Sequence, residues 1–250
     1  MQKNLEKHAF ALYYSNVSPA RLSVHGHITI VDESVMHRIA HVLRLAVHDE
    51  LILFDQRQNV TCTIVTITKK QIVCLITNVA TNTVHTPEII ILLPLLKRHA
   101  LEEALYACVE LAASRVQLVI TEKVQKSWDN DRDLQRLQAI VVAAAEQSKN
   151  FAFPELHAPI PLASALEQHT HRARAVVFAV NGNPLLELLT TIHANRLSSL
   201  VLTLGPEGDF THSEYQLLAQ RGFQAYALTP TVLRSFQALA VGLGAVRSVQ

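Results

Sequence analysis

The chain has 250 residues, of which 49% are hydrophobic and 17% are charged, and its formal net charge is +1. A chain of this length and composition can bury one large core or two smaller ones, which excludes an intrinsically disordered protein. The small net charge lacks the basic surplus of a stand-alone nucleic-acid-binding domain, so any contact with nucleic acid must come from local patches.

The first residues, MQKNLEKHAFALYY, are too polar for a secretory signal peptide, and no apolar run approaches the ~20 residues that a membrane-spanning helix needs. We therefore expect a cytoplasmic protein without a membrane segment. The three cysteines are widely spaced, and the thirteen histidines form no HExxH or paired His/Cys motif. The sequence predicts free, mostly buried thiols at Cys62, Cys74 and Cys108, and no metal site.

The N-terminal third of the chain alternates short strand-like runs with turns. The runs are 10–14, 27–31, 50–55, 60–67 and 71–77, and the last three follow one another closely. This spacing predicts a small antiparallel barrel or sheet. Residues 78–88 are polar, contain a proline and lack periodicity, so we expect them to link two domains, 1–79 and 80–250.

A helical pattern interrupts these strands at residues 34–45, with Ser34 as the expected N-cap. Its apolar stripe consists of Met36, Ile39 and Leu43. Its basic face consists of His37, His41 and Arg44, with Arg38 beside them. Two interpretations of that face stay open, because surface cations are either simply solvated or contact the phosphates of a nucleic acid.

From residue 89 onward, continuous apolar runs alternate with helical segments. The runs are 89–96, 116–120, 175–180, 200–204 and 225–228, and the expected helices are 99–114, 131–149, 211–221 and 231–248. Strands rich in Val, Ile and Leu that alternate with helices are typical of an α/β fold whose parallel sheet is covered on both faces. Because ligands of such sheets bind beyond the carboxyl ends of the strands, the loops at those ends are the candidate site.

The loop after run 200–204 has the sequence LGPEGDF, in which Gly205 and Gly208 flank Pro206 and Glu207. Glycine lets the backbone adopt positive φ and approach a ligand closely, and proline stiffens the turn. The next segment, Thr211 to Glu214, has the pattern of a helix capping box. A tight turn without any ligand explains the same residues, so both interpretations stay open.

Two neighbouring loops also follow predicted strands. AVNGNPL covers residues 179–185, and the segment that begins ALTPTV at residue 227 leads into the last helix. The three loops could line one pocket with backbone N–H and C=O groups. Such a pocket suits an adenine-type ligand, which has donors and acceptors on its edge and an apolar face.

Together these segments resemble the bacterial 16S ribosomal RNA uridine N3-methyltransferases, the ribosomal RNA small subunit methyltransferase E family of the SPOUT class. The resemblance covers nearly the whole chain. It is carried by HRIAHVLRLAVHDELILFD (37–55), LPLLKRHALEEALYACVELAASRVQLVITEK (93–123), AAAEQSKNFAFPEL (143–156) and, most specifically, LGPEGDFTHSE (204–214). Residues 228–238 stand where the family has a Leu-Gly-x-Arg-Ile-Leu-Arg-Thr-Glu-Thr-Ala run.

The resemblance implies a PUA-like RNA-binding β-barrel in residues 1–79, and a SPOUT methyltransferase domain with a knotted parallel sheet in residues 80–250. The C-terminal segment of that domain would form a trefoil knot, one of the few exceptions to unknotted chains. The resemblance further implies a homodimer that methylates N3 of a specific uridine in 16S ribosomal RNA of the small ribosomal subunit, with S-adenosylmethionine as the methyl donor.

The resemblance also implies roles for particular residues. The cofactor-binding residues would be Val180, Asn181, Leu204, Gly205, Pro206, Gly208, Leu228, Thr229, Pro230 and Leu233. The RNA side would be formed by Arg38, Arg44, Lys97, Arg98 and Glu207, with Glu207 bracing either the knot or the substrate. Arg234 is the catalytic candidate, because a permanent cation could stabilise the uracil anion; a structural ion pair or a phosphate contact is its alternative role.

The chain also departs from the family's pattern at several positions. The departures are Asp209 and Thr229 in place of glycine, Thr231, Asn150 and His8 in place of arginine, and Ser235-Phe236-Gln237 in place of Thr-Glu-Thr. They motivate two further hypotheses. One is a divergent, non-catalytic relative that binds RNA, and the other is a SPOUT enzyme with a different target nucleoside.

Overall fold

The computed structural model describes residues 9–17, 22–124, 128, 130–169 and 173–249. The chain divides into two compact units, Met1–Thr83 with Glu146–Ala152, and Val84–Ala145 with Phe153–Gln250. His8, one of the departures from the family pattern, lies outside the described residues. Within the described residues, none of the helices combines the length and the hydropathy needed to cross a membrane.

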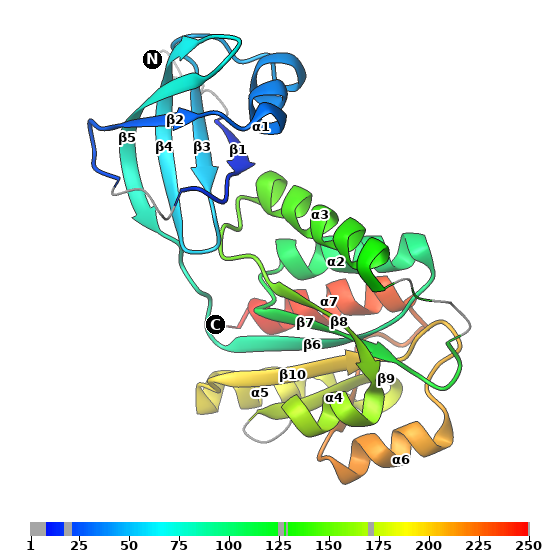
Figure 1. Cartoon of the computed structure of the whole chain (residues 1–250). Coiled ribbons are helices and arrows are strands. Elements are labelled where there is room, and N and C mark those ends of the chain that lie inside the picture. Colours follow the sequence, from blue (N-terminus) through cyan, green and yellow to red (C-terminus); the bar gives the residue numbers. More distant parts are fainter. Residues whose placement is uncertain (1–8, 18–21, 125–127, 129, 170–172, 250) are drawn as a thin grey trace. The chain divides into compact units, whose positions relative to one another are not determined.

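The N-terminal unit contains a five-stranded sheet in the order β1-β3-β4-β5-β2 (Figure 1). The strands are β1 (Phe10–Tyr13), β2 (His27–Ile30), β3 (Glu50–Phe54), β4 (Gln58–Ile67) and β5 (Ile72–Thr81). Strands β1 and β3 are parallel and all other neighbours are antiparallel, which confirms the expected small, mainly antiparallel sheet.

The linker expected at 78–88 begins too early, because β5 continues to Thr81. Its last residue, Thr81, pairs with Gln58 of β4. The sequence pattern missed this end because the residues from Thr77 to Thr81 are exposed or half-buried, so they lack the apolar alternation that marks the first half of the strand.

The expected helix at 34–45 is shorter and less regular than its sequence pattern indicates. It consists of α1 (Glu33–His37), which continues as the π-helix η1 (Arg38–Val42). Asp32 caps it, since its Oδ1 accepts the N–H of Val35 at 3.0 Å, so the prediction of Ser34 as N-cap is wrong. Aspartate is among the strongest N-cap residues, and Asp32 lies two positions before Ser34.

The apolar stripe of this helix is confirmed, because Ile39 is fully buried and both Met36 and Leu43 pack against the same core. The helix ends at Val42, however, and Arg44 lies beyond it with a φ of 54°. Arg44 therefore does not share a helical face with His37 and His41.

An ion pair joins the start of this helical segment to residues 146–152. The Arg38 guanidinium donates to both carboxylate oxygens of Glu146, one of them at 2.8 Å, and the Tyr13 N–H donates to Glu146 Oε1 at 3.0 Å. Hydrogen bonding to Glu146 raises the pKa of Arg38 above its ordinary value, despite partial burial. Nearby, the rings of Phe54 and Phe151 lie 4.6 Å apart between centroids. These contacts explain why 146–152 belongs to the N-terminal unit.

The C-terminal unit contains a six-stranded sheet in the order β11-β9-β10-β6-β7-β8. The strands are β6 (Glu88–Pro94), β7 (Arg115–Ile120), β8 (Glu155–Pro161), β9 (Arg174–Pro184), β10 (Ser199–Leu204) and β11 (Gln224–Ala227). Every neighbouring pair is parallel, as the sequence predicts. Strand β8 was not expected, because it is an exposed edge strand that contains Pro159 and Pro161.

Helices cover both faces of this sheet (Figure 1). They are α2 (Arg98–Glu110), α3 (Asn130–Ser148), α4 (Leu162–His169), α5 (Leu185–Asn195), α6 (His212–Gln220) and α7 (Ser235–Arg247). On one face, apolar residues of α4 and α6 pack against Ile90, Val177 and Val201 of the strands. Helices α2 and α7 pack against each other, and α7 also packs on β9 and β10. Of these helices, α4 and α5 were not expected.

The last helix starts at Ser235, four residues later than the sequence pattern indicates, and it is held at both ends. Ser235 Oγ donates to the carbonyl of Gly205 at 2.9 Å. At the other end, the Arg247 guanidinium donates to the carbonyls of Leu111, Ala112 and Pro87. It thereby satisfies acceptors that the end of α2 leaves without a partner in the helix.

Between these ends, α7 lies close to the sheet at Gly242. A Cβ at this position would overlap the ring of Phe178, whereas a Cβ at Gly244 would lie 3.9 Å from Leu111, an ordinary contact. The absence of a side chain at Gly242 therefore sets how closely the helix approaches β9.

We predict opposite effects for two substitutions on this helix. Gly242→Ala should lower the free energy of unfolding by about 1–3 kcal/mol, because the added methyl group displaces Phe178. Gly244→Ala, the matched control, should raise it by about 0.5–1 kcal/mol, because alanine favours the helix and nothing obstructs it. Chemical denaturation of both variants measures the difference, and equal effects would contradict the packing at Gly242.

Candidate functional site

A cavity of about 690 Å³ lies at the carboxyl ends of the parallel strands of the C-terminal unit. Its lining comes from residues 178–180 within β9 and from the segments that follow β6, β10 and β11. The sequence predicts a loop at 179–185, but β9 continues to Pro184, where it pairs with β11. Such a cavity has the position and size of small-molecule sites in α/β proteins, which span roughly 300–1,000 Å³.

The structure brings most of the residues expected to bind a cofactor into this cavity. Its lining includes Val180, Leu204, Gly205, Pro206, Leu228, Thr229 and Leu233, together with Lys97, Glu207 and Arg234. It does not include Asn181, Gly208 or Pro230, and Gly208 instead lines an adjoining groove. Three segments that are far apart in the sequence therefore meet at one place at the carboxyl edge of the sheet: part of β9 and the loops after β10 and β11.

Two glycines allow the loops to come this close. A Cβ at Gly182 would overlap the backbone of Tyr226, so β11 could not lie beside the distal half of β9. A Cβ at Gly205 would overlap the carboxylate of Asp209. Gly205 also lines the cavity, so at this position the wall consists of main chain rather than side chain.

Glu207 fixes the loop after β10 to the start of α2. Its Oε1 accepts the N–H of Lys97, the N-cap residue of α2, at 2.9 Å. Since no side chain of α2 itself caps this end, the carboxylate supplies the missing acceptor from a distant part of the chain. A carboxylate at a helix N-terminus is also favoured by the helix dipole.

Glu214 likewise binds the backbone of a loop at this edge of the sheet, in this case the loop after β7. The predicted capping box is confirmed, since the Thr211 side chain accepts the N–H of Glu214 and the Glu214 carboxylate accepts the N–H of Thr211. The other oxygen of this buried carboxylate accepts the N–H of Glu122, directly after β7, at 2.8 Å. The loops after β6, β7 and β10 are therefore tied together by two carboxylates.

Asp209 adopts the left-handed conformation, with a φ of 56°. Aspartate tolerates this region better than most residues. Its Oδ1 accepts two hydrogen bonds, one from the N–H of Phe210 and one from the hydroxyl of Tyr215, each at 2.8 Å. Burial, followed by this hydrogen bond and the charge of Asp209, raises the pKa of Tyr215 above its ordinary value. The departure from glycine is therefore accommodated by a local hydrogen bond to α6.

The segment between β11 and α7 forms the remaining wall. Thr229 Oγ1 donates to the carbonyl of Thr231 at 2.7 Å, so this hydroxyl is satisfied within the turn. Arg234 is exposed and lines the cavity. Among the described residues, no carboxylate lies within salt-bridge distance of its guanidinium. The structure thus gives no support to a structural ion pair as the role of Arg234.

The five residues expected to face RNA fall on both units. Arg38 is engaged with Glu146, while Arg44 is exposed, and both belong to the N-terminal unit. Lys97, Arg98 and Glu207 lie in the C-terminal unit, where Lys97 and Glu207 line the cavity and all three line the adjoining groove. Arg98 pairs with Glu102 at 3.2 Å, but Glu102 is shared with Arg136.

The cysteines take no part in the site. All three are buried and free. Hydrogen bonding with Cys74 and burial raise the pKa of the Cys62 thiol, and burial raises that of Cys108, so neither is prepared as a nucleophile. Across the residues that the structure describes, no group of three His, Cys, Asp or Glu side chains could hold a metal ion.

Sequence reasoning missed several residues of the site, among them Phe178, Tyr215 and Lys123. Phe178 and Tyr215 line the cavity, and Lys123 lines the adjoining groove. The sequence could have indicated Lys123, because it follows the predicted strand β7 and the ends of parallel strands lie at one edge of the sheet, as does the glycine loop after β10. No local signal marks Tyr215, whose role depends on Asp209 reaching it across the turn.

Known families account for most of the chain. The pattern of the RNA methyltransferase domain matches residues 84–247, and that of the RNA methyltransferase PUA domain matches residues 37–77. The chain is similar to two proteins named ribosomal RNA small subunit methyltransferase E. It is 30% identical over 155 residues to the Synechocystis protein, covering 61% of this chain, and 35% identical over 127 residues to the Mycobacterium bovis protein, covering 48%.

The match spans about half the length of each relative, 50% and 47%. A solved structure covers more of the chain. The ribosomal RNA small subunit methyltransferase E from Neisseria gonorrhoeae, bound to S-adenosyl methionine, superposes with a TM-score of 0.83. The alignment covers 96% of this chain and 98% of that one at 23% identity, which shows that the two share a fold.

We predict that the carboxylate of Glu214 stabilises the loops around the cavity. Glu214→Ala should lower the free energy of unfolding by about 1–3 kcal/mol, because two backbone donors lose their acceptor. Glu214→Gln should cost less, since one amide oxygen can still accept. Denaturant unfolding measures both, and Glu187→Ala, on the surface of α5, should change stability by no more than about 0.5 kcal/mol. If Glu214→Ala were as mild as this control, the carboxylate bridge would be unimportant.

Proposed function

The chain belongs to the RNA methyltransferase family, and we propose that it methylates N3 of a uridine in 16S ribosomal RNA with S-adenosylmethionine as methyl donor. The observation that carries the proposal is the cavity at which part of β9 and the loops after β10 and β11 meet. Family membership supports methyl transfer to RNA. The names of the relatives support the small ribosomal subunit as substrate, which would place the protein in the cytoplasm.

The residues of the cavity fit S-adenosylmethionine. Its apolar lining, which includes Phe178, Leu204 and Leu228, could accept the face of an adenine ring. The main chain exposed at Gly205 could offer donors and acceptors to the edge of that ring. The cofactor-binding residues that we propose are those of the expected set that line the cavity, Val180, Leu204, Gly205, Pro206, Leu228, Thr229 and Leu233. Asn181, Gly208 and Pro230 would act by shaping these loops.

When bound, S-adenosylmethionine supplies a methyl group on a positively charged sulfur. In the proposed reaction, a bond forms between uracil N3 and the methyl carbon while the carbon–sulfur bond breaks, and the N3 proton is released to water. The contribution of the protein is to hold the acceptor nitrogen in line with the methyl group, which removes much of the entropic barrier.

Arg234 would stabilise the charge that develops on the uracil ring. Its guanidinium lines the cavity, and among the described residues no carboxylate neutralises it. It stays charged at any pH relevant to catalysis. A fixed cation beside a developing anion in a site that excludes water contributes strongly to catalysis.

We further propose that the C-terminal segment is knotted, as the resemblance to SPOUT proteins implies. Two contacts support this threading. The start of α7 is bonded to Gly205, and the backbone of Tyr226 lies against Gly182 of β9, so the segment from 228 to 234 has one end beside β9 and the other beside the loop after β10. An experimental structure in which the last helix can be withdrawn without passing through those loops would contradict the knot.

The N-terminal unit would bind a part of the RNA other than the nucleotide that is methylated. Its PUA-domain match supports this role. Arg44 is exposed and is the better candidate for a phosphate contact, whereas the guanidinium of Arg38 is already engaged with Glu146. We propose that Arg38 chiefly supports the unit, and that Lys97 and Arg98 contact RNA at the cavity.

Two alternatives remain distinguishable by experiment. The side chains of Asp209 and Thr229, which line the cavity where the family pattern has glycine, favour a relative that binds RNA without catalysis. Calorimetry distinguishes this alternative from the proposed enzyme, because a non-catalytic relative would not bind S-adenosylmethionine and the enzyme would. An enzyme with a different target would bind the cofactor but leave its methyl group on another nucleoside.

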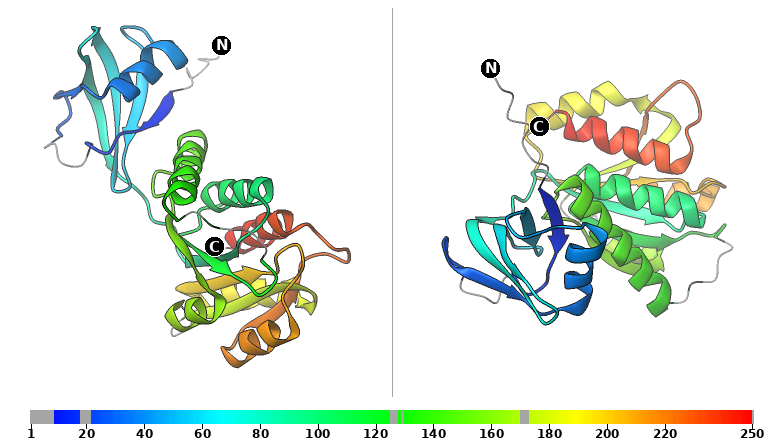
Figure 2. Two further views of the ribbon diagram at one scale, coloured as in Figure 1. Left: turned by 45° about the vertical axis from the view of Figure 1, so that its right-hand side comes forward. Right: turned by 90° about the horizontal axis from the view of Figure 1, so that it is seen from above.

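We propose that the protein acts as a homodimer, because several apolar side chains are exposed, two of them in the lining of the cavity (Val180 and Val232) and two on helices α5 and α7. They are Val180, Leu186, Val232 and Val241, with exposed fractions of 53, 70, 79 and 43%. Leu186 and Val241 belong to α5 and α7, which lie side by side (Figure 2). Burying such a patch against a second copy would remove it from water.

Light scattering should therefore give twice the monomer mass of 27.8 kDa. The double variant Leu186→Asp with Val241→Asp should shift the mass toward the monomer, because it places two charges in the interface. Val24→Asp, at an exposed valine of the N-terminal unit, is the control and should leave the dimer intact. A wild-type protein that is monomeric throughout would contradict the assembly.

The main test is methylation of small ribosomal subunits that lack the modification. With S-adenosylmethionine, the purified protein should produce N3-methyluridine, detected by mass spectrometry of the digested RNA. Arg234→Ala should lower kcat by about 100- to 1,000-fold, as expected when one charge-stabilising donor is lost, while the affinity for the cofactor changes little. Arg196→Ala, at the opposite end of the sheet, is the control and should retain full activity. Absence of the product with the wild-type protein would refute the proposed reaction.

A further inference from the structure

A second concave surface, which we call the groove, adjoins the cavity. It has a volume of about 810 Å³ and is lined by residues 95–98, 122–124 and 206–208, which follow β6, β7 and β10. Lys97, Pro206 and Glu207 line both the groove and the cavity. A ligand that is longer than the cavity could therefore continue directly into the groove.

Lys123 provides a positive charge at a defined place in this groove. Its Nζ donates to the carbonyl of Gly208 at 2.6 Å and lies 3.5 Å from that of Phe210. The absence of a side chain at Gly208 allows the lysine stem to lie against the loop, since a Cβ there would be 3.4 Å from Lys123 Cδ. The ammonium group is thus held against the 205–210 loop by two neutral carbonyl oxygens.

Cations outnumber carboxylates in the groove, since its lining contains Lys97, Arg98 and Lys123 against Glu122 and Glu207. Arg98 is paired with Glu102 outside the groove. The two carboxylates of the groove bind neutral donors rather than its lysines, since Glu207 accepts the backbone N–H of Lys97 and Glu122 accepts the hydroxyl of Ser213 at 2.9 Å. Among the described residues, no salt bridge neutralises Lys97 or Lys123.

We propose that the groove binds the ribose-phosphate backbone of the RNA strand next to the nucleotide in the cavity, and that Lys123 contacts a phosphate. The proposal rests on the proposed function. Phosphate contacts commonly fix the register of a nucleic acid on a protein, and a lysine that is already oriented loses little entropy on binding. The rigid attachment of Lys123 to the same loop that lines the cavity would couple the position of the strand to that of the acceptor base.

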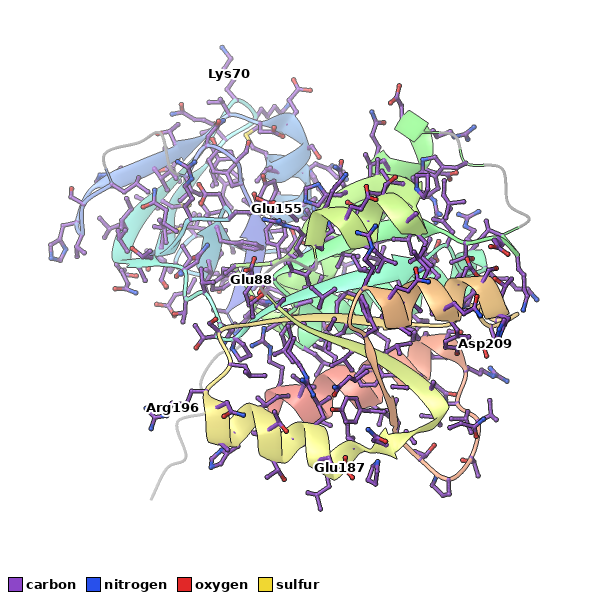
Figure 3. All side chains as sticks on the ribbon, turned by 90° about the horizontal axis from the view of Figure 1, so that it is seen from below. Lys70, Glu88, Glu155, Glu187, Arg196 and Asp209 are labelled. Carbon is purple, nitrogen blue, oxygen red and sulfur yellow. The ribbon has the colours of Figure 1, made fainter. Side chains whose placement is uncertain are left out.

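The test measures binding of a 16S ribosomal RNA transcript to the full-length protein between about 50 and 200 mM potassium chloride. Lys123→Gln should weaken binding and reduce the slope of log affinity against log salt concentration by about one. Lys123→Arg, which retains the charge, should retain the slope. The control is Arg196→Gln, which removes an exposed cation beyond the amino end of β10, opposite Asp209 (Figure 3), and should leave RNA binding unchanged.

Calorimetry with S-adenosylmethionine separates this inference from the function on which it rests. The inference holds if Lys123→Gln binds the cofactor as the wild type does and only the salt slope falls. It is overturned if the slope is unchanged, or if RNA and cofactor affinities fall together, which would make Lys123 a support of the 205–210 loop. A wild-type protein that does not bind the cofactor at all would instead refute the proposed function.

Discussion

The attachment of α7 at both of its ends is the constraint on which the candidate site depends. Arg247 ties the end of the helix to the carbonyls after α2 and to Pro87, and Ser235 ties its start to Gly205. Burial lowers the pKa of Arg247 to about 10, so the guanidinium remains charged near neutral pH and the backbone carbonyls compensate for its lost hydration. With both ends fixed, the segment that precedes α7 must cross the carboxyl edge of the sheet, where it forms one wall of the cavity.

The opposite wall is fixed by carboxylates that act on backbone donors. Glu207 and Glu214 come from the same loop and helix start, and they accept N–H groups that follow β6 and β7. Parallel strands end at the same edge of a sheet, so their loops are crowded with backbone groups that the ladder no longer satisfies. Satisfying these groups from one loop makes the loop rigid, and a rigid loop can position a ligand without losing entropy when it binds.

Replacement of a residue in a motif does not by itself remove the geometry of that motif. Asp209 stands where the family pattern has glycine, yet it adopts the left-handed conformation and bonds to Tyr215. Thr229 likewise bonds within its own turn. The backbone of the cavity therefore tolerates both departures.

The sequence by itself determined the features that depend on local patterns. Continuous apolar runs between helices predicted the parallel sheet, the alternating runs before residue 80 predicted the mainly antiparallel one, and Thr211 with Glu214 predicted a capping box. It also placed turn-forming residues after three strands that share an edge, which was sufficient to expect one site. The sequence did not predict the edge strand β8, because its exposed residues and prolines show no alternation of apolar and polar positions.

Only the tertiary structure decided which partners the charged residues have. Arg38 meets Glu146 across 108 positions, and Arg247 meets carbonyls more than a hundred positions away. It likewise revealed Lys123 beside Gly208 and placed residues 146–152 with the N-terminal unit. The physical reason is that periodicity reports which face of an element is buried, while the order of strands in the sheet determines which buried faces and strand ends come together.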